Sequence, residues 1–123
     1  MQLAHDPQSG GDHVRGVAAD RILLASGERR TSFAMATGVE PFDWPVADAN
    51  SMTAADCEAI VALQPAVVIL GTGPKQVFPP REVLAAFLTR RIGVEFMDNA
   101  AAARTYNVLL GEGRKVAAGF ILG

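Results

Sequence analysis

The sequence is poor in the residues that usually form disulfides, metal sites and catalytic sites. It contains one cysteine, Cys57, and two histidines, His5 and His13. A lone thiol excludes an internal disulfide and fits a reducing compartment, so we expect Cys57 to fill the core. We interpret the histidines as solvent-exposed residues of the N-terminal segment, with a two-histidine metal site as the alternative. Because no nucleophile-elbow or paired metal-ligand motif occurs, we predict no catalytic residues, metal site or cofactor.

The chain also lacks long apolar runs and any large excess of charge. The 11 basic and 13 acidic residues give a formal net charge of −2, without the basic patch that is typical of nucleic-acid binding. No apolar run approaches the roughly 18 residues of a membrane helix. The N-terminus has neither the basic nor the apolar region of a signal peptide. We therefore expect a soluble, cytoplasmic protein that binds no nucleic acid and does not insert into a membrane.

The strongest positive signal is a strand near the middle of the chain. Val67–Leu70 is a continuous run of branched apolar residues, which predicts a strand buried on both faces. A glycine-rich loop, Gly71–Pro74, ends this strand. A helix beginning near Phe78–Pro80 and a second strand over Ile92–Met97 complete a strand–helix–strand unit, in which the two strands run parallel. We predict both strands to be central and buried.

Shorter patterns predict the N-terminal half. Residues 13–19, 21–25 and 31–36 have strand character, and residues 26–29 form a turn between them. Together they predict an antiparallel β-hairpin layer that covers or extends the main sheet.

Helix signals and a last strand complete the chain. A capping-box pattern predicts a helix from Thr53 to about Gln64, and an N-cap at Asp98 or Asn99 predicts another to about Leu110. Residues 115–122 follow as a final strand. The fold class is therefore α/β. No linker or internal repeat divides the chain, so we predict a single domain over residues 1–123, with residues 1–12 as a flexible tail.

A candidate ligand site lies where the two predicted parallel strands end. Their carboxyl ends share one edge of the sheet, which would bring the glycine loop opposite the helix that begins near Asn99. Glycines let the backbone approach a ligand closely, and a helix N-terminus offers N–H groups to an anion. We predict that a small anionic ligand binds here, to Gly71, Thr72, Gly73, Lys75, Arg104 and Asn107. The alternative is a tight structural turn, with Arg104 paired to Glu95, Asp98 or Glu112.

A second candidate site is aromatic. Phe42 and Trp44 lie in a segment between Gly38 and Ala49 whose prolines exclude a central strand or a helix interior. Two interpretations stay open for these large side chains. They close one end of the core, or they form an exposed patch that binds a protein partner.

The chain resembles a known family of small α/β domains of unknown function. The resemblance is carried by Leu70–Gly73, by Val94–Asp98, by Ala103–Leu109 with its Arg-Thr-Tyr-Asn tetrad, and by Glu112–Ala118. The family includes the mitochondrial NADH dehydrogenase (complex I) alpha subcomplex assembly factor 3. The resemblance implies a three-layer domain around a mixed sheet with one antiparallel strand. It also implies no assigned activity for most members, and a role in assembling a respiratory complex for the mitochondrial branch.

Two positions depart from the family's pattern. Ala103 stands where a cysteine is common, and Asn99 stands where a threonine is common. Thiol chemistry at that position is therefore absent from this chain. Two functional hypotheses follow: a non-catalytic binding or assembly protein, and an enzyme or ligand-binding domain that uses the glycine loop and Arg104.

Overall fold

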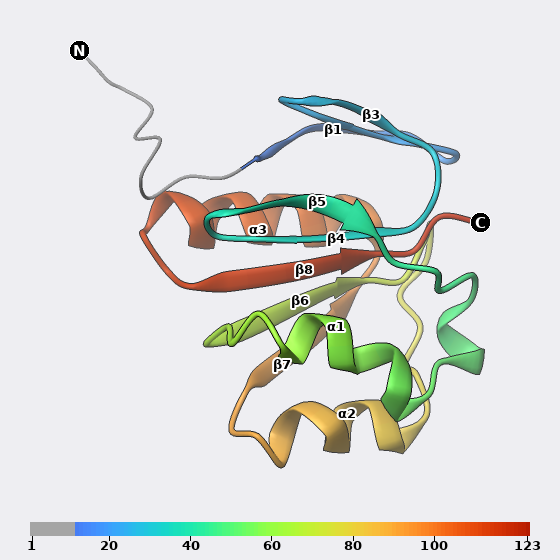
Figure 1. Ribbon diagram of the computed structural model, residues 1–123. Helices are drawn as coiled ribbons and strands as arrows, with labels where there is room; N and C mark the ends of the chain where they lie inside the picture. Colours follow the sequence, from blue (N-terminus) through green and yellow to red (C-terminus); the bar gives the residue numbers. More distant parts are fainter. Residues whose placement is uncertain (1–11) are drawn as a thin grey trace.

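The computed structural model describes residues 12–123, and its framework is a five-stranded mixed sheet (Figure 1). The strand order is β5-β4-β8-β6-β7. β6, β7 and β8 run parallel to one another, whereas β4 is antiparallel to both β8 and β5. The mixed sheet with one antiparallel strand is therefore confirmed. The strands are β4 (Phe33–Ala36), β5 (Val39–Asp43), β6 (Val67–Gly71), β7 (Gly93–Met97) and β8 (Val116–Phe120).

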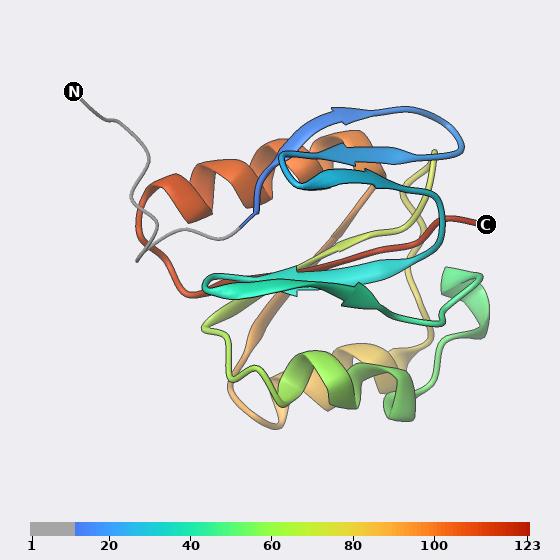
Figure 2. The ribbon, with the colours of Figure 1, turned by 45° about the horizontal axis from the view of Figure 1, so that its top comes forward.

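Two covering layers bury the two faces of this sheet (Figure 2). One face carries the 3-10 turn η2 (Ala54–Cys57), α1 (Glu58–Val61) and α2 (Arg81–Leu88). The other carries α3 (Asn99–Gly111) and a separate three-stranded sheet. Each face has its own apolar cluster, so the three-layer α/β fold predicted from the sequence and its resemblance is confirmed.

The middle strand, β8, is buried along its whole length. Val116, Ala118 and Phe120 pack with the α3 layer, and Ala117 packs with the α1–α2 layer. Its small residues let the neighbouring layers come close, because the side chains of Trp44, Ile60 and Leu70 fill the space above Gly119. The sequence pattern V-A-A-G-F thus encodes a strand with no room on either face.

The N-terminal layer differs from the prediction in two ways. Its sheet consists of β1 (Val14–Val17), β2 (Ile22–Leu24) and β3 (Gly27–Arg29), in the order β1-β2-β3. Residues 27–29 are therefore a strand rather than part of a turn. The predicted strand over residues 31–36 belongs to the main sheet as β4, because all four of its residues are buried and must be covered on both faces.

The two edges of the main sheet correct a further prediction. β7 is parallel to β6 as predicted, but it lies at the edge of the sheet and not at its centre. The physical reason is that exposed and half-buried residues alternate along β7: Gly93 and Glu95 are exposed, whereas Val94 and Phe96 are half-buried. β5 forms the opposite edge and contains Pro41, which has no N–H to donate to a neighbouring strand.

The remaining predictions concern helix ends and the N-terminal segment. The Thr53–Asp56 capping box is present, but it starts a 3-10 turn, and the α-helix after it ends at Val61. A second 3-10 turn, η1, spans Ala49–Ser51. The predicted flexible tail and His5 lie outside the described residues, except for Asp12, which accepts a hydrogen bond from the Ser26 backbone N–H.

The packing over β8 gives a test of the core. A Cβ at position 119 would lie 2.7 Å from Trp44 Cζ3 and 3.0 Å from Ile60 Cδ1. We expect Gly119→Ala to lower the free energy of unfolding by about 1–3 kcal/mol, the usual cost of overpacking. Gly93→Ala is the matched control, because its Cβ meets only Val67 Cγ2 at 4.0 Å. Urea denaturation of both variants checks this, and equal stabilities would contradict the packing described here.

Candidate functional site

A groove runs between β1 and the first three turns of α3, and we call it the β1–α3 groove. It consists of two adjoining hollows of about 180 and 240 Å³, which share Val17 and Ala100. Together they reach the ~300–1,000 Å³ that is typical of ligand sites. The first hollow is lined by Val17–Ala19, Gly73–Pro74 and Asp98–Ala100; the second is lined by Val14–Val17, Ala100, Ala103, Arg104 and Asn107.

Asn107 holds the two walls of the groove together. Its Oδ1 accepts a hydrogen bond from the Val14 N–H at 3.0 Å, and its Nδ2 donates one to the Val14 carbonyl at 2.8 Å. The predicted ligand residue is therefore used within the fold, where it fixes β1 against α3. One helical turn earlier, Ala103 and Ala100 present only methyl groups to the groove, so the helix wall is smooth there.

Two arginines line the same hollow from different elements. Arg15 belongs to β1 and Arg104 to α3, and both are exposed. Within residues 12–123 neither guanidinium pairs with a carboxylate, so the alternative pairing of Arg104 with Glu95, Asp98 or Glu112 does not form. Arg15 was not predicted from the sequence, because its only signal is a polar position in a short strand.

The glycine loop is largely occupied with its own structure. Thr72 is buried, and its Oγ1 lies 2.7 Å from the Lys75 carbonyl while accepting from the Val77 N–H at 3.0 Å. Gly71 lies beneath the Asn99 side chain, so both residues are covered. Of the predicted loop residues, only Gly73 lines the groove; the exposed Lys75 does not.

The N-terminus of α3 is capped from within. The Asp98 carboxylate accepts a hydrogen bond from the Ala101 N–H at 2.8 Å. A negative charge already occupies the place where a helix would attract an anion, which makes this end of the groove unfavourable for a second one. The helix end of the predicted anion site is thus disfavoured, and the positive charge lies at the arginine end.

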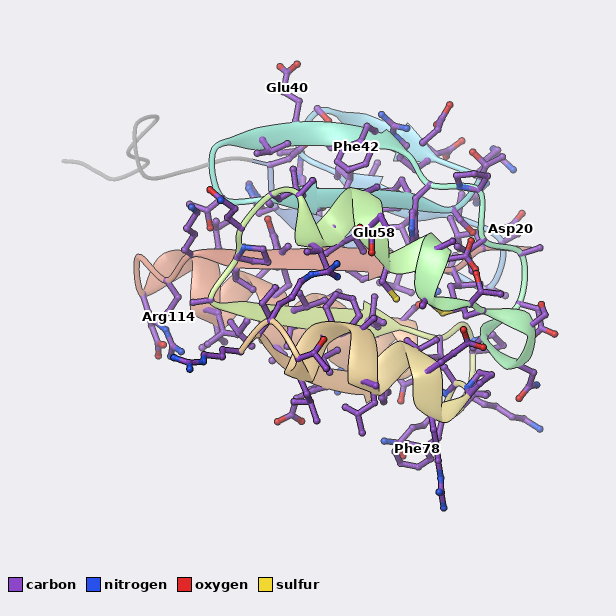
Figure 3. All side chains as sticks on the ribbon, turned by 60° about the horizontal axis from the view of Figure 1, so that its bottom comes forward. Asp20, Glu40, Phe42, Glu58, Phe78 and Arg114 are labelled. Carbon is purple, nitrogen blue, oxygen red and sulfur yellow. The ribbon has the colours of Figure 1, made fainter. Side chains whose placement is uncertain are left out.

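The structure distinguishes between the two interpretations of the aromatic segment. Trp44 is 2% exposed, and its Nε1 donates a hydrogen bond to the Asp56 carbonyl at 2.8 Å. Trp44 therefore closes the core and is not available to a partner, while Phe42 is half-buried against the same cluster. The exposed aromatic is Phe78, which projects into solvent beyond the start of α2 (Figure 3) and is 71% exposed.

The two reactive side chains of the core are both held in their neutral forms. Burial, with smaller contributions from Asp56, Glu58 and Glu82, raises the pKa of the Cys57 thiol to about 11. Burial and the charge of Asp12 also raise the pKa of Tyr106 well above its usual value. The Tyr106 hydroxyl is buried without a hydrogen-bond partner among the described residues. Neither group lines the β1–α3 groove, and neither is activated as a nucleophile.

The raised pKa of Cys57 gives a pH dependence with a definite sign. The folded state holds the thiol proton more tightly than the unfolded state, so this contribution is complete below pH 9 and is lost as the pH rises to about 11. We expect the stability difference between the wild type and Cys57→Ala to shrink by about 2 kcal/mol over this range. Urea denaturation at pH 8 and pH 10.5 measures this, and a difference that does not change with pH would contradict it.

Comparisons with known proteins define the family. A curated relative, the "13 kDa major membrane protein" of Francisella tularensis subsp. holarctica, is 31% identical over 106 residues, which cover 85% of this chain and 83% of the relative. A Xanthomonas campestris protein solved by NMR is 41% identical, with all of this chain and 93% of that chain covered and a TM-score of 0.84. A Bordetella pertussis protein, described as a Mth938-like domain, is 26% identical over 99% of this chain and 92% of its own, with a TM-score of 0.80.

Among residues 12–123, no helix has the length and apolar character needed to cross a membrane. The family model "Protein of unknown function (DUF498/DUF598)" matches residues 14–121, which is most of the chain. The resemblance inferred from the sequence is confirmed, and the chain belongs to the DUF498/DUF598 family.

Proposed function

We propose that this protein is a non-catalytic, cytoplasmic binding protein, similar in role to an assembly factor, and that it binds an acidic group of its partner in the β1–α3 groove. One observation carries the proposal. Arg15 and Arg104 come from two different elements and line one hollow without a carboxylate partner among the described residues. The molecule as a whole has a net charge of −2, so this positive surface is local.

The chemistry of arginine supports an acidic partner. A guanidinium presents several N–H donors in a fixed plane and can hold a carboxylate through two parallel hydrogen bonds. Elsewhere on the molecule, other arginines pair with carboxylates of this chain: Arg29 lies 3.0 Å from Asp43, and Arg90 lies 3.2 Å from Glu58. Among residues 12–123, no carboxylate pairs with Arg15 or Arg104, so their donors are available to a group from outside. Charges of this kind contribute to the rate and specificity of association more than to stability.

Among residues 12–123, the groove contains no side chain that is placed for catalysis. Asn107 is committed to β1, Thr72 is turned into its own loop, and Ala103 carries no functional group. Within residues 12–123, no group of three or more His, Cys, Asp or Glu side chains could hold a metal ion. These features support binding over catalysis. A partner at a membrane surface would reconcile a cytoplasmic chain with a relative that is named a membrane protein.

Poly-L-glutamate is a suitable probe, because it offers carboxylates without a defined partner surface. We expect Arg15→Ala and Arg104→Ala each to weaken binding by about two- to fivefold, as for one exposed charge pair, and the double variant to weaken it further. Arg81→Ala is the matched control: it removes an exposed arginine that lies on α2, away from the groove. Fluorescence anisotropy at several salt concentrations measures the dissociation constants.

The control decides how the result is interpreted. If Arg81→Ala weakens binding as much as the groove variants, the attraction is general and the groove is not the site. If sulfate binds tightly in an Arg104-dependent manner while poly-L-glutamate does not bind, the small-anion alternative replaces the proposal. That outcome would assign Arg104 to a ligand pocket together with Gly73, as the sequence analysis predicted.

A further inference from the structure

We infer that the occupant of the β1–α3 groove is an extended acidic segment of a protein, which adds a short strand to the open edge of β1. This inference rests on the proposed function and specifies the partner: a peptide in β conformation whose carboxylates meet Arg15 and Arg104. Strand addition of this kind uses main-chain hydrogen bonds for affinity and side chains for specificity.

The hydrogen bonds of the small sheet show which backbone groups face outward. The Ala25 N–H donates to the His13 carbonyl at 3.0 Å, and the Ala18 N–H donates to the Arg21 carbonyl at 2.9 Å. In an antiparallel pair, hydrogen-bonded and non-hydrogen-bonded positions alternate. The pairs Val14 with Leu24 and Val17 with Ile22 are therefore the non-hydrogen-bonded ones. It follows that the N–H and C=O of Val14 and Val17 point away from β2.

At Val14, a side chain already takes the place of a neighbouring strand. The Asn107 amide accepts from the Val14 N–H and donates to its carbonyl, which is the pair of bonds that another strand would make. At Val17 no hydrogen bond from another element reaches the backbone within residues 12–123. The register shift between Val14 and Gly16 is a bulge that separates the satisfied position from the open one.

The open position lies where the groove lies. Val17 lines both hollows, and the residue is 36% exposed. The opposite wall is formed by the small residues Ala100 and Ala103 of α3, which leave room for a backbone. An extended peptide of three residues spans about 10 Å. Arg15 and Arg104 then lie at the sides of such a peptide, where carboxylates on it would meet them.

The edges of the main sheet are protected, in contrast. At β5, Pro41 removes one N–H, as noted above. At β7, the Gln76 side chain donates to the Phe96 carbonyl at 2.8 Å, and Glu95 places a charge on the strand. Proline, charge and covering side chains are common ways to prevent unwanted strand pairing. At Val17, the edge of β1 has no proline and no covering side chain among residues 12–123, and its nearest charge along the strand is Arg15, which would attract an acidic peptide. This edge is therefore open to a partner.

The test uses a fluorescein-labelled peptide, acetyl-Glu-Val-Glu-Val-Glu-amide, and three N-methylated forms. Two of these forms lack the backbone N–H groups of one edge each, and the third lacks all of them. We expect the fully methylated peptide to bind at least tenfold more weakly than the parent, because it cannot donate to the Val17 carbonyl. At least one of the single-edge forms should stay within threefold of the parent, because alternate N–H groups point to opposite edges.

Hydrogen exchange provides the readout on the protein. The Val17 amide should exchange at least tenfold more slowly with the parent peptide bound. The Leu23 amide should not change, because Leu23 and Gly16 form a hydrogen-bonded pair between β2 and β1. Strand addition is overturned if the fully methylated peptide binds like the parent, if all methylated forms weaken equally, or if the Val17 amide is unaffected. When such a result occurs while Arg104→Ala still weakens binding, the proposed function stands and only the strand addition fails.

Discussion

The buried amide of Asn99 joins the three elements that position the groove. Its Oδ1 accepts from the Gly73 N–H at 3.1 Å, its Nδ2 donates to the Ile121 carbonyl at 3.0 Å, and its backbone N–H donates to the Gly73 carbonyl at 2.8 Å. The loop after β6, the end of β8 and the start of α3 are thereby fixed to one side chain. Any substitution that removed the amide would leave buried backbone groups unpaired, which is costly in a core. Gly71 is part of the same arrangement, since a Cβ there would clash with Asn99 Oδ1.

A second amide, eight residues later on the same helix, extends this order to the small sheet. Asn99 fixes where α3 begins relative to the main sheet, and Asn107 fixes β1 relative to α3. The groove is the space left between these two attachments, where the bulge in β1 leaves Val17 open and small alanines form the facing wall of the helix. The shape of the groove therefore follows from the two amides, and its positive charge follows from the two arginines, which form no ion pair among the described residues.

The sequence predicted the fold well wherever a local pattern determines structure. The apolar run of β6, the crossover to β7, the Asp98 cap and the alanine-rich start of α3 are all short-range signals, and each is found. The errors concern neighbours in space. The apolar character of Val94–Met97 could not show that β7 has a neighbouring strand on one side only. Likewise, nothing in the residues Phe33–Ala36 of β4 indicates that β8 is the neighbouring strand. Which strand lies beside which is decided by contacts between distant residues.

The candidate site was predicted in part for the same reason. The residues that follow β6 and begin α3 do come together, because parallel strands end at one edge of a sheet. Their chemistry differed from the prediction, since the side chains of Thr72 and Asn99 form hydrogen bonds with nearby backbone groups and Asp98 caps the helix.

The place of Arg15 in the groove could not be predicted from the sequence, because it depends on α3, about 90 positions away in the chain. An exposed arginine is informative only when its surroundings are known, and here they are known for residues 12–123. Surface ion pairs contribute little to stability, about 0–1 kcal/mol each, so an unpaired arginine costs the fold little. The proposal of recognition therefore depends on the position of Arg15 and Arg104 beside an open strand edge, and not on their lack of an ion pair alone.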